Sequence, residues 1–191
     1  MGASIAGVGE TRERVFEAAA RMLRTCSYLG FSFNDIAQEI GISKASLHHH
    51  FPSKEALGLE LLAAAAQRFV EWRESAPHAP GAALDAFVAM YRNTLSAGQA
   101  VCPGGSFAAG WDCVGDELKS AVRKLRADQI DWLTRVFKTQ DAQRTTAEAS
   151  ALAAAVFAAC QGALVSARVT GKAKDFDAAM TVVRALAKAS A

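Results

Sequence analysis

The segment Gly41-Ile42-Ser43-Lys44-Ala45-Ser46-Leu47-His48-His49-His50-Phe51-Pro52 carries the clearest structural pattern in the sequence. Gly41 suits the left-handed residue that ends one helix, and Ser43, two residues later, can cap the free N–H groups of the next. Within that second helix, Leu47 and Phe51 are four residues apart and share one side, which predicts that this side packs against a core. Two helices joined by so tight a turn form a helix-turn-helix.

The other side of the second helix carries small or polar residues. Lys44, Ala45 and Ser46 leave its N-terminal end unobstructed, so backbone and short side chains can reach base edges in a DNA major groove. Three histidines follow at 48–50, and consecutive helical residues point about 100° apart, so they cannot surround one metal ion. We therefore expect no metal site and interpret the histidines as hydrogen-bond donors to DNA, which gain charge on protonation.

The following helix begins with a lysine. Pro52 ends the preceding helix, Ser53 can cap the next, and Lys54 lies in its first turn. A positive charge there opposes the helix dipole, which predicts an anionic partner, and a DNA phosphate is the natural one. The alternative is a solvated surface lysine. Arg12, near the start of the first helix, has the same two interpretations: a phosphate contact or an exposed arginine.

Several segments carry a family pattern: Thr11-Arg12-Glu13-Arg14-Val15, Ala18-Ala19, Asp35-Ile36-Ala37, Gly41 to Leu47, and Phe51-Pro52-Ser53-Lys54-Glu55-Ala56-Leu57. From about Thr11 to Leu62 the chain resembles, without a gap, the N-terminal domain of TetR-family transcriptional regulators. Two positions depart from the pattern. Ser27 stands where members usually carry Gly before the aromatic residue that follows the first helix, and a triple histidine precedes Phe51 where members commonly have tyrosine.

The resemblance implies a ligand-responsive, homodimeric DNA-binding regulator, most often a repressor that a small-molecule inducer releases from operator DNA. The candidate DNA contacts are Arg12, Ser32, Asn34, Ser43, Lys44, Ala45, Ser46, His48, His49, His50 and Lys54. The alternative is a helical small-molecule-binding or interaction protein, with or without a thiol sensor, that has no operator function.

Composition predicts an all-α protein, since 51% of the 191 residues are apolar, Ala-rich helix formers dominate, and β-branched runs of period two are lacking. The net charge of +2 is too small to identify a nucleic-acid binder, so DNA contacts must depend on where a few cations lie. We expect a flexible arm at residues 1–10 and a helix-turn-helix domain at 11–57. A larger ligand-binding and dimerisation domain follows at 76–191, and a helix at 54–75 is shared.

The ends of individual helices can also be predicted. Thr11 suits the N-cap of a first helix that reaches about residue 25, and Ser32 with Asp35 resembles a capping pair for the second. After a linker at 77–81, helices are expected at about 82–97, 116–138, 146–170 and 175–189, with a short one ending near residue 113.

The N-terminus lacks the pattern of a secretory signal, which predicts a cytoplasmic protein whose four cysteines stay reduced. The Ala-rich run at 149–167 is apolar enough to raise the question of a membrane helix, but it contains Gln161 and serines and is interpreted as a soluble interface helix. Cys102 lies in a Gly/Pro loop and is expected to be exposed there, as a possible thiol sensor. Cys113 and Cys160 are interpreted as structural.

Enzymatic activity is not expected, because no histidine lies beyond residue 78 to pair with a Cys or Ser nucleophile. No cofactor is expected either. The C-terminal part is rich in aromatic residues, most of which are interpreted as core, while the family resemblance implies a ligand cavity among them. The candidate ligand contacts are Phe69, Trp72, Phe87, Met90, Tyr91, Cys102, Phe107, Trp111, Gln129, Trp132, Phe157 and Gln161.

The last two helices each carry an apolar stripe, and one monomer cannot easily cover both. Small side chains permit close helix approach, so we expect the stripes to pair with their symmetry mates in a four-helix dimer interface. The alternative is that the second stripe packs on the ligand-binding domain. The candidate dimer contacts are Leu152, Val156, Ala159, Cys160, Ala163, Leu164, Ala167, Phe176, Met180, Val183 and Leu186.

Overall fold

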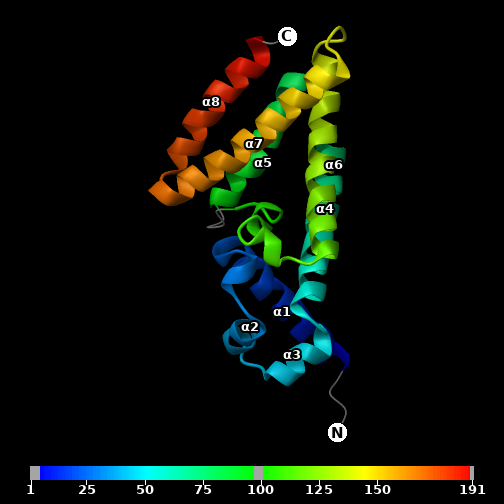
Figure 1. The fold of residues 1–191 in the computed structure, drawn as a ribbon, viewed down its shortest axis with the longest axis vertical. Helices are drawn as coiled ribbons and strands as arrows, with labels where there is room; N and C mark the ends of the chain where they lie inside the picture. The colour runs from blue at the N-terminus through cyan, green and yellow to red at the C-terminus, as the bar shows by residue number, and fades with distance from the viewer. Residues whose placement is uncertain (1–4, 97–100, 190–191) are drawn as a thin grey trace. The chain divides into compact units, whose positions relative to one another are not determined.

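The computed structural model describes residues 5–96 and 101–189, and the regular structure within these ranges is helical (Figure 1). The α-helices are α1 (Ile5–Cys26), α2 (Phe33–Ile40), α3 (Lys44–His50), α4 (Lys54–Ser75), α5 (Pro80–Ser96), α6 (Asp116–Gln140), α7 (Thr146–Thr170) and α8 (Ala173–Ala189). Short 3-10 helices are η1 (Tyr28–Gly30), η2 (Gly105–Phe107) and η3 (Trp111–Cys113). The predicted all-α fold is confirmed.

The chain folds into two compact units. The first comprises residues 1–65 and 103–122, and the second comprises residues 66–102 and 123–191. Both α4 and α6 therefore begin in the first unit and end in the second. The expected domains followed chain order, whereas here residues 103–122, with η2 and η3, group with the N-terminal helices.

The first unit packs around a small apolar core. Val15, Leu23, Ile36, Leu47 and Phe51 are each at most 2% exposed. They come from α1, α2, α3 and the residue that ends α3, so three helices share one interior. Helices as short as α2 and α3 gain most of their stability from such packing rather than from intrinsic propensity.

The start of α1 differs from the sequence-based expectation. The helix begins at Ile5, six residues before the predicted N-cap Thr11, which lies inside it. Residues 5–10 of the expected flexible arm are thus helical, although Gly7 and Gly9 each disfavour a helix; no proline interrupts the segment. The rest of the arm, residues 1–4, falls outside the described residues.

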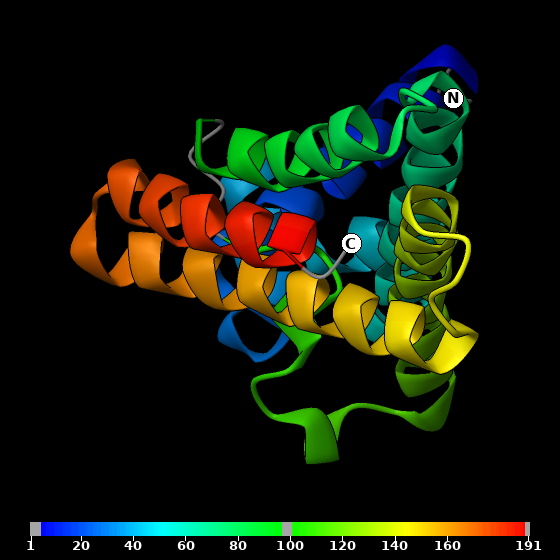
Figure 2. The same ribbon diagram turned by 90° about the horizontal axis from the view of Figure 1, so that it is seen from above.

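In the second unit α7 and α8 run side by side, and α5 packs on both (Figures 1 and 2). Thr145 caps α7 through a capping box with Glu148, and Gly171 ends it in the left-handed conformation, φ 69°. Phe87, Leu133, Phe137, Leu164 and Phe176 are fully buried between these helices and α6. The interior is therefore made by five helices, counting the C-terminal part of α4.

The residues predicted to form the dimer interface are mostly core residues of the second unit. Those buried are Val156, Cys160, Ala163, Leu164, Ala167, Phe176 and Met180, and those partly buried are Leu152, Ala159 and Val183. Leu186, at 61% exposure, is the one member of the predicted set that faces outward. The most apolar stripe of each helix thus packs α7 and α8 against their own domain, and these side chains are covered within the chain itself.

A second apolar face on these two helices is exposed. On α7 it consists of Ala151, Ala155, Ala158, Gly162, Val165 and Val169, whose alternating spacings of four and three keep them on one side. On α8 it consists of Ala178, Val182, Ala185 and Leu186. Val169 is 81% exposed and Val182 58%. We call these residues the outer α7–α8 face.

Helix α7 is long and apolar enough to cross a membrane by length and composition alone, with 33% of its most apolar window buried. Core helices of soluble proteins pass the same test. Here one side of α7 contributes Ala149, Ala153, Val156, Cys160 and Leu164 to the buried core. Packing in a helical domain therefore accounts for the apolar composition of this side.

Candidate nucleic-acid interface

The turn between α2 and α3 has the predicted geometry. Gly41 ends α2 in the left-handed region, with φ 73° and ψ 37°, which glycine adopts without steric cost. The N–H of Ile42 donates to the carbonyl of Ala37 over 3.0 Å. Ser43 Oγ accepts a hydrogen bond of 3.1 Å from the N–H of Ser46, which caps α3. These bonds fix the angle at which α3 leaves α2.

Helix α3 turns one side to the core and the other to solvent. Leu47 is fully buried, as is Phe51 at the end of the helix. On the opposite side Lys44, Ala45 and His49 are exposed. The N-terminal end of α3 is thus open, as a helix that enters a major groove requires. The residues predicted to contact bases lie on this open side.

The three histidines are not equivalent. The His48 ring lies 5.0 Å from the ring of Phe33, and its Nδ1 is 3.4 Å from the carbonyl oxygen of Pro52. His49 and His50 contact each other edge to face, with ring centres 5.7 Å apart. His48 and His49 are both exposed, but His48 contacts Phe33 and Pro52 of its own domain, whereas His49 contacts only the ring of His50 among the described residues.

The start of α2 presents a capping box. Asp35 Oδ2 accepts hydrogen bonds from the N–H of Ser32, at 2.6 Å, and from its hydroxyl, at 2.8 Å. In return Ser32 Oγ accepts from the N–H of Asp35 over 3.3 Å. These hydrogen bonds from Ser32 lower the pKa of Asp35 below its ordinary value. The predicted capping pair is confirmed, and the Ser32 hydroxyl serves it, whereas Asn34 next to it is exposed.

Lys54 has an internal role in place of the predicted phosphate contact. Its Nζ donates to the backbone carbonyls of Tyr28, at 2.5 Å, and of Phe31. It also lies 4.5 Å and 4.4 Å from the centres of the two rings of these residues. Burial lowers the pKa of Lys54. The anionic partner that the sequence suggested is thus replaced by carbonyls in and just after η1.

Other cations of the first unit are also paired within it. Both carboxylate oxygens of Glu60 accept hydrogen bonds from Arg12 Nη2, at 2.8 and 2.6 Å, and the Arg12 guanidinium lies 4.6 Å from the centre of the Phe51 ring. Arg14 Nη2 donates to the carbonyl of Ile40 over 2.6 Å. Arg12 is thus an exposed arginine, as one of its two interpretations had it, and it is paired with Glu60 of its own unit. Lys44 is exposed and has no partner within the described part of the chain.

Most of the predicted ligand contacts form one aromatic cluster in the second unit. The Trp132 ring stacks on Phe87 at 5.9 Å and meets Trp72 edge to face at 5.0 Å. Phe69 stacks on Trp72 at 5.6 Å, and Tyr91 joins Phe87 at 5.2 Å. Phe157 lies edge to face with Tyr91 at 6.3 Å, and Met90 packs against the same core.

Polar groups are paired inside this cluster. The Tyr91 hydroxyl donates to Gln129 Oε1 over 2.6 Å, and Gln161 Nε2 donates to the Cys102 sulfur over 2.8 Å. Burial raises the pKa of Tyr91 well above its ordinary value. The sequence identified these polar residues as a group, and the structure brings them together in a largely apolar interior.

Three predictions for this region are corrected. Phe107 is fully buried in the first unit, where its ring stacks on Tyr28 at 4.8 Å, and Trp111 belongs to the same unit. Cys102 is 8% exposed rather than open to solvent, because α7 and its Gln161 cover it. Cys113, interpreted as structural, is exposed, while Cys160 is buried and its pKa is raised to about 12 by that burial.

The outer α7–α8 face is the feature that the sequence analysis missed. Its signal was present, since residues 151, 155, 158, 162, 165 and 169 follow a regular spacing of four and three. On α7 this stripe consists only of alanine, glycine and valine. The larger apolar side chains on the opposite side of the helix therefore determined the periodicity that was recognised in the sequence. When a helix has two apolar sides, the sequence alone does not show which side is buried in the core and which is exposed.

The N-terminal part of the chain is similar in sequence to known proteins. Residues 15–61 match the profile of a family described as bacterial regulatory proteins, tetR family. The HTH-type transcriptional regulator LmrA of Bacillus subtilis is 42% identical over 53 residues, which are 27% of this chain and 28% of LmrA. The likeness in sequence therefore spans less than a third of that curated relative.

Solved structures share the fold over nearly the whole chain. A TetR-family transcriptional regulator from Agrobacterium tumefaciens has a TM-score of 0.84 and 28% identity, and the match covers 95% of this chain and 97% of that one. AibR in complex with isovaleryl coenzyme A and operator DNA has a TM-score of 0.62 at 17% identity, with 78% and 83% covered. The second likeness concerns the fold alone.

Proposed function

We propose that this chain is a ligand-responsive DNA-binding regulator of the TetR family, in which most members are repressors. Residues 15–61 match the family profile, and a TetR-family regulator shares the fold over 95% of the chain. A small molecule bound by the second unit would release it from operator DNA. The observation that carries the proposal is the Gly41–Ser43 turn, which holds α3 with Leu47 buried and Lys44, Ala45 and His49 outward. A DNA-reading helix needs this orientation.

Specificity would come from α3 rather than from net charge. Arg12 and Lys54 are engaged within the first unit, so Lys44 is the exposed cation at the open end of α3. Small side chains at 45 and 46 let the backbone approach the bases closely. Affinity for unrelated DNA should therefore be modest, because nonspecific binding depends on the number of phosphate contacts.

The proposed regulator is a homodimer, and its partner is a second copy of this chain on the outer α7–α8 face. Valines at 165, 169 and 182 are half or more exposed, and the alanines and glycine between them permit two helices to approach closely. A two-fold axis through this face gives isologous contacts and places two copies of α3 on one operator. Half-sites would then lie roughly 34–36 Å apart or somewhat further.

Regulation would use the aromatic cluster of the second unit and helix α4. A ligand has to enter among Tyr91, Gln129 and Gln161 and replace the hydrogen bonds that these side chains now make to one another and to Cys102 inside an apolar interior. Helix α4 belongs to both units, so a shift of its C-terminal half can change the separation of two α3 helices in a dimer. AibR, a protein of the same fold, has been solved in complex with isovaleryl coenzyme A and operator DNA, so this fold can hold both kinds of partner.

The proposed setting is the cytoplasm, where DNA is accessible and the free cysteines stay reduced. A mobility shift with DNA that flanks the protein's own gene tests the function. A sharp complex that resists excess unrelated DNA is expected. Failure to shift any flanking fragment at micromolar protein would instead favour a helical binding protein without operator function.

A further inference from the structure

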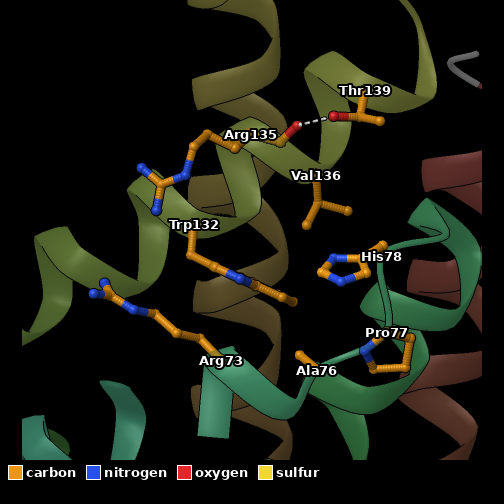
Figure 3. Close-up of a pocket in the computed structure, with 8 residues that line it drawn as sticks. All are labelled: Arg73, Ala76, Pro77, His78, Trp132, Arg135, Val136 and Thr139. Atoms are coloured by element: carbon orange, nitrogen blue, oxygen red, sulfur yellow. Dashed lines mark hydrogen bonds between the residues drawn. The ribbon is translucent and has the colours of Figure 1, made fainter. Parts of the chain in front are cut away.

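We propose that the second unit carries a site for a small planar carboxylate at the turn between α4 and α5, which shares only Trp132 with the aromatic cluster described above. It is a pocket of about 130 Å³ lined by Arg73, Ala76, Pro77, His78, Trp132, Arg135, Val136 and Thr139 (Figure 3). This volume is close to that of cavities that accept a single benzene ring. The inference goes beyond the proposed regulation and does not depend on it.

The lining is cationic without a carboxylate among its eight residues. Two other arginines of the second unit are neutralised: Arg92 pairs with Asp177 at 2.7 Å and Arg184 with Asp85 at 2.5 Å. In contrast, over the described residues the side chains of Arg73, Arg135 and His78 have no hydrogen-bond, ion-pair or ring partner. Charges of one sign gathered without counter-charges are stabilised by a bound anion.

The arrangement of these groups favours a flat ligand. Figure 3 shows the Trp132 indole in the middle of the lining residues, with the guanidinium groups of Arg73 and Arg135 on one side of it and the His78 ring on the other. Guanidinium groups bind carboxylates through paired, parallel hydrogen bonds. Trp132 and Val136 supply apolar surface for a ring, so charge and apolar surface lie in adjacent parts of one pocket.

The frame around the pocket is rigid. Trp132, Arg135, Val136 and Thr139 lie on one face of α6, where their spacing of three and four residues places them in line. Across from them, Ala76 is buried and Pro77 restricts the backbone that carries His78. The backbone therefore needs little ordering when a ligand binds, and the main entropic cost is the ordering of the two arginine side chains.

Benzoate is the probe that tests the proposal, and benzamide is its uncharged match. Titration calorimetry on the full chain, with the Trp132 indole N–H followed by NMR, should show saturable binding of benzoate at one site. Arg73→Gln and Arg135→Gln should each weaken it at least tenfold, and benzamide should bind at least tenfold more weakly than benzoate. Arg68→Gln, at an exposed position of α4 outside the pocket, should leave benzoate binding unchanged.

Three results would overturn the proposal. Equal affinity for benzoate and benzamide would show that the charge of the ligand does not matter. An equal loss of benzoate affinity in Arg68→Gln and in the two pocket variants would show only a general effect of net charge. If inorganic phosphate displaced benzoate at equal concentration, the surface would bind anions without selectivity for a carboxylate. Thermal melting of each variant verifies that the fold is kept. None of these measurements involves DNA, so their failure is distinct from failure of the proposed regulatory function.

Discussion

The ammonium group of Lys54 donates a 2.5 Å hydrogen bond to the backbone carbonyl of Tyr28 and lies 4.5 Å from the centre of that residue's ring. A second carbonyl, that of Phe31, accepts from the same group. The first residue of α4 is thereby joined to the segment between α1 and α2. Because Tyr28 also stacks on Phe107, the contact links three separate segments of the first unit.

Lys54→Ala is expected to lower the free energy of unfolding by about 1–3 kcal/mol, because two carbonyls lose a charged donor in a half-buried site. The salt dependence of DNA binding should stay the same. Lys44→Ala should do the reverse: stability unchanged, and the slope of log affinity against log salt shallower by about one, as for one lost phosphate contact. Urea unfolding and a salt titration separate the two. A shallower salt slope in Lys54→Ala would show that Lys54 contacts a DNA phosphate.

Ser27→Gly is expected to stabilise the protein by about 1 kcal/mol. Ser27 has φ 65° and ψ 170°, a region that glycine alone adopts readily, and it is the one non-glycine residue with positive φ in the described ranges. This is also the position at which the chain departs from the family pattern. Ser27→Ala serves as the control, since it keeps the strained Cβ. If both variants unfold at the same urea concentration, the backbone at Ser27 is not strained.

Asp35 should contribute to stability in a pH-dependent way. Its pKa is lowered in the folded state by the Ser32 hydrogen bonds, so the folded state holds its proton less tightly than the unfolded state. The contribution is therefore complete above the ordinary value of 3.8 and is lost as the pH falls through the lowered pKa. Asp35→Asn should flatten this acid limb in urea unfolding at a series of pH values. An unchanged acid limb would show that the capping carboxylate is not held in this way.

The outer α7–α8 face should be the dimer interface. Ala158→Glu combined with Val182→Glu is expected to give a folded monomer, because two charges would be buried at the two-fold axis in each subunit. Mass in solution is measured by light scattering, with Ala127→Glu at an exposed position of α6 as the matched control. Ala163→Glu, in contrast, should unfold the domain, since Ala163 is 5% exposed and lies in the core. A double variant that stays dimeric would place the interface elsewhere.

The sequence was most informative where local chemistry determines structure. The Gly41–Ser43 turn, the Ser32–Asp35 cap and the burial of Leu47 depend on neighbours within a few residues, and each was predicted correctly. The partner of Lys54 could not be predicted in this way, because the carbonyls of Tyr28 and Phe31 are more than twenty residues distant in sequence.

The second unit shows the same limit at larger scale. Periodicity identified the stripe that contains Ala163 and Phe176 but not which surface would cover it, and in the structure its own domain covers it. Composition placed Phe107 at the ligand site, whereas its ring packs on Tyr28 in the other unit. Long-range packing decides these cases, and a single sequence carries little information about it.

The open face of α3 should read DNA, and a nuclease footprint on the DNA flanking the protein's own gene tests this role. We expect the wild-type protein to protect a two-fold symmetric site whose half-sites lie about one helical turn apart or somewhat more. Ala45→Glu, on the exposed face of α3, should abolish protection, and Ala63→Glu, exposed on α4 in the same unit, should preserve it. Protection that persists in Ala45→Glu would contradict this role of α3.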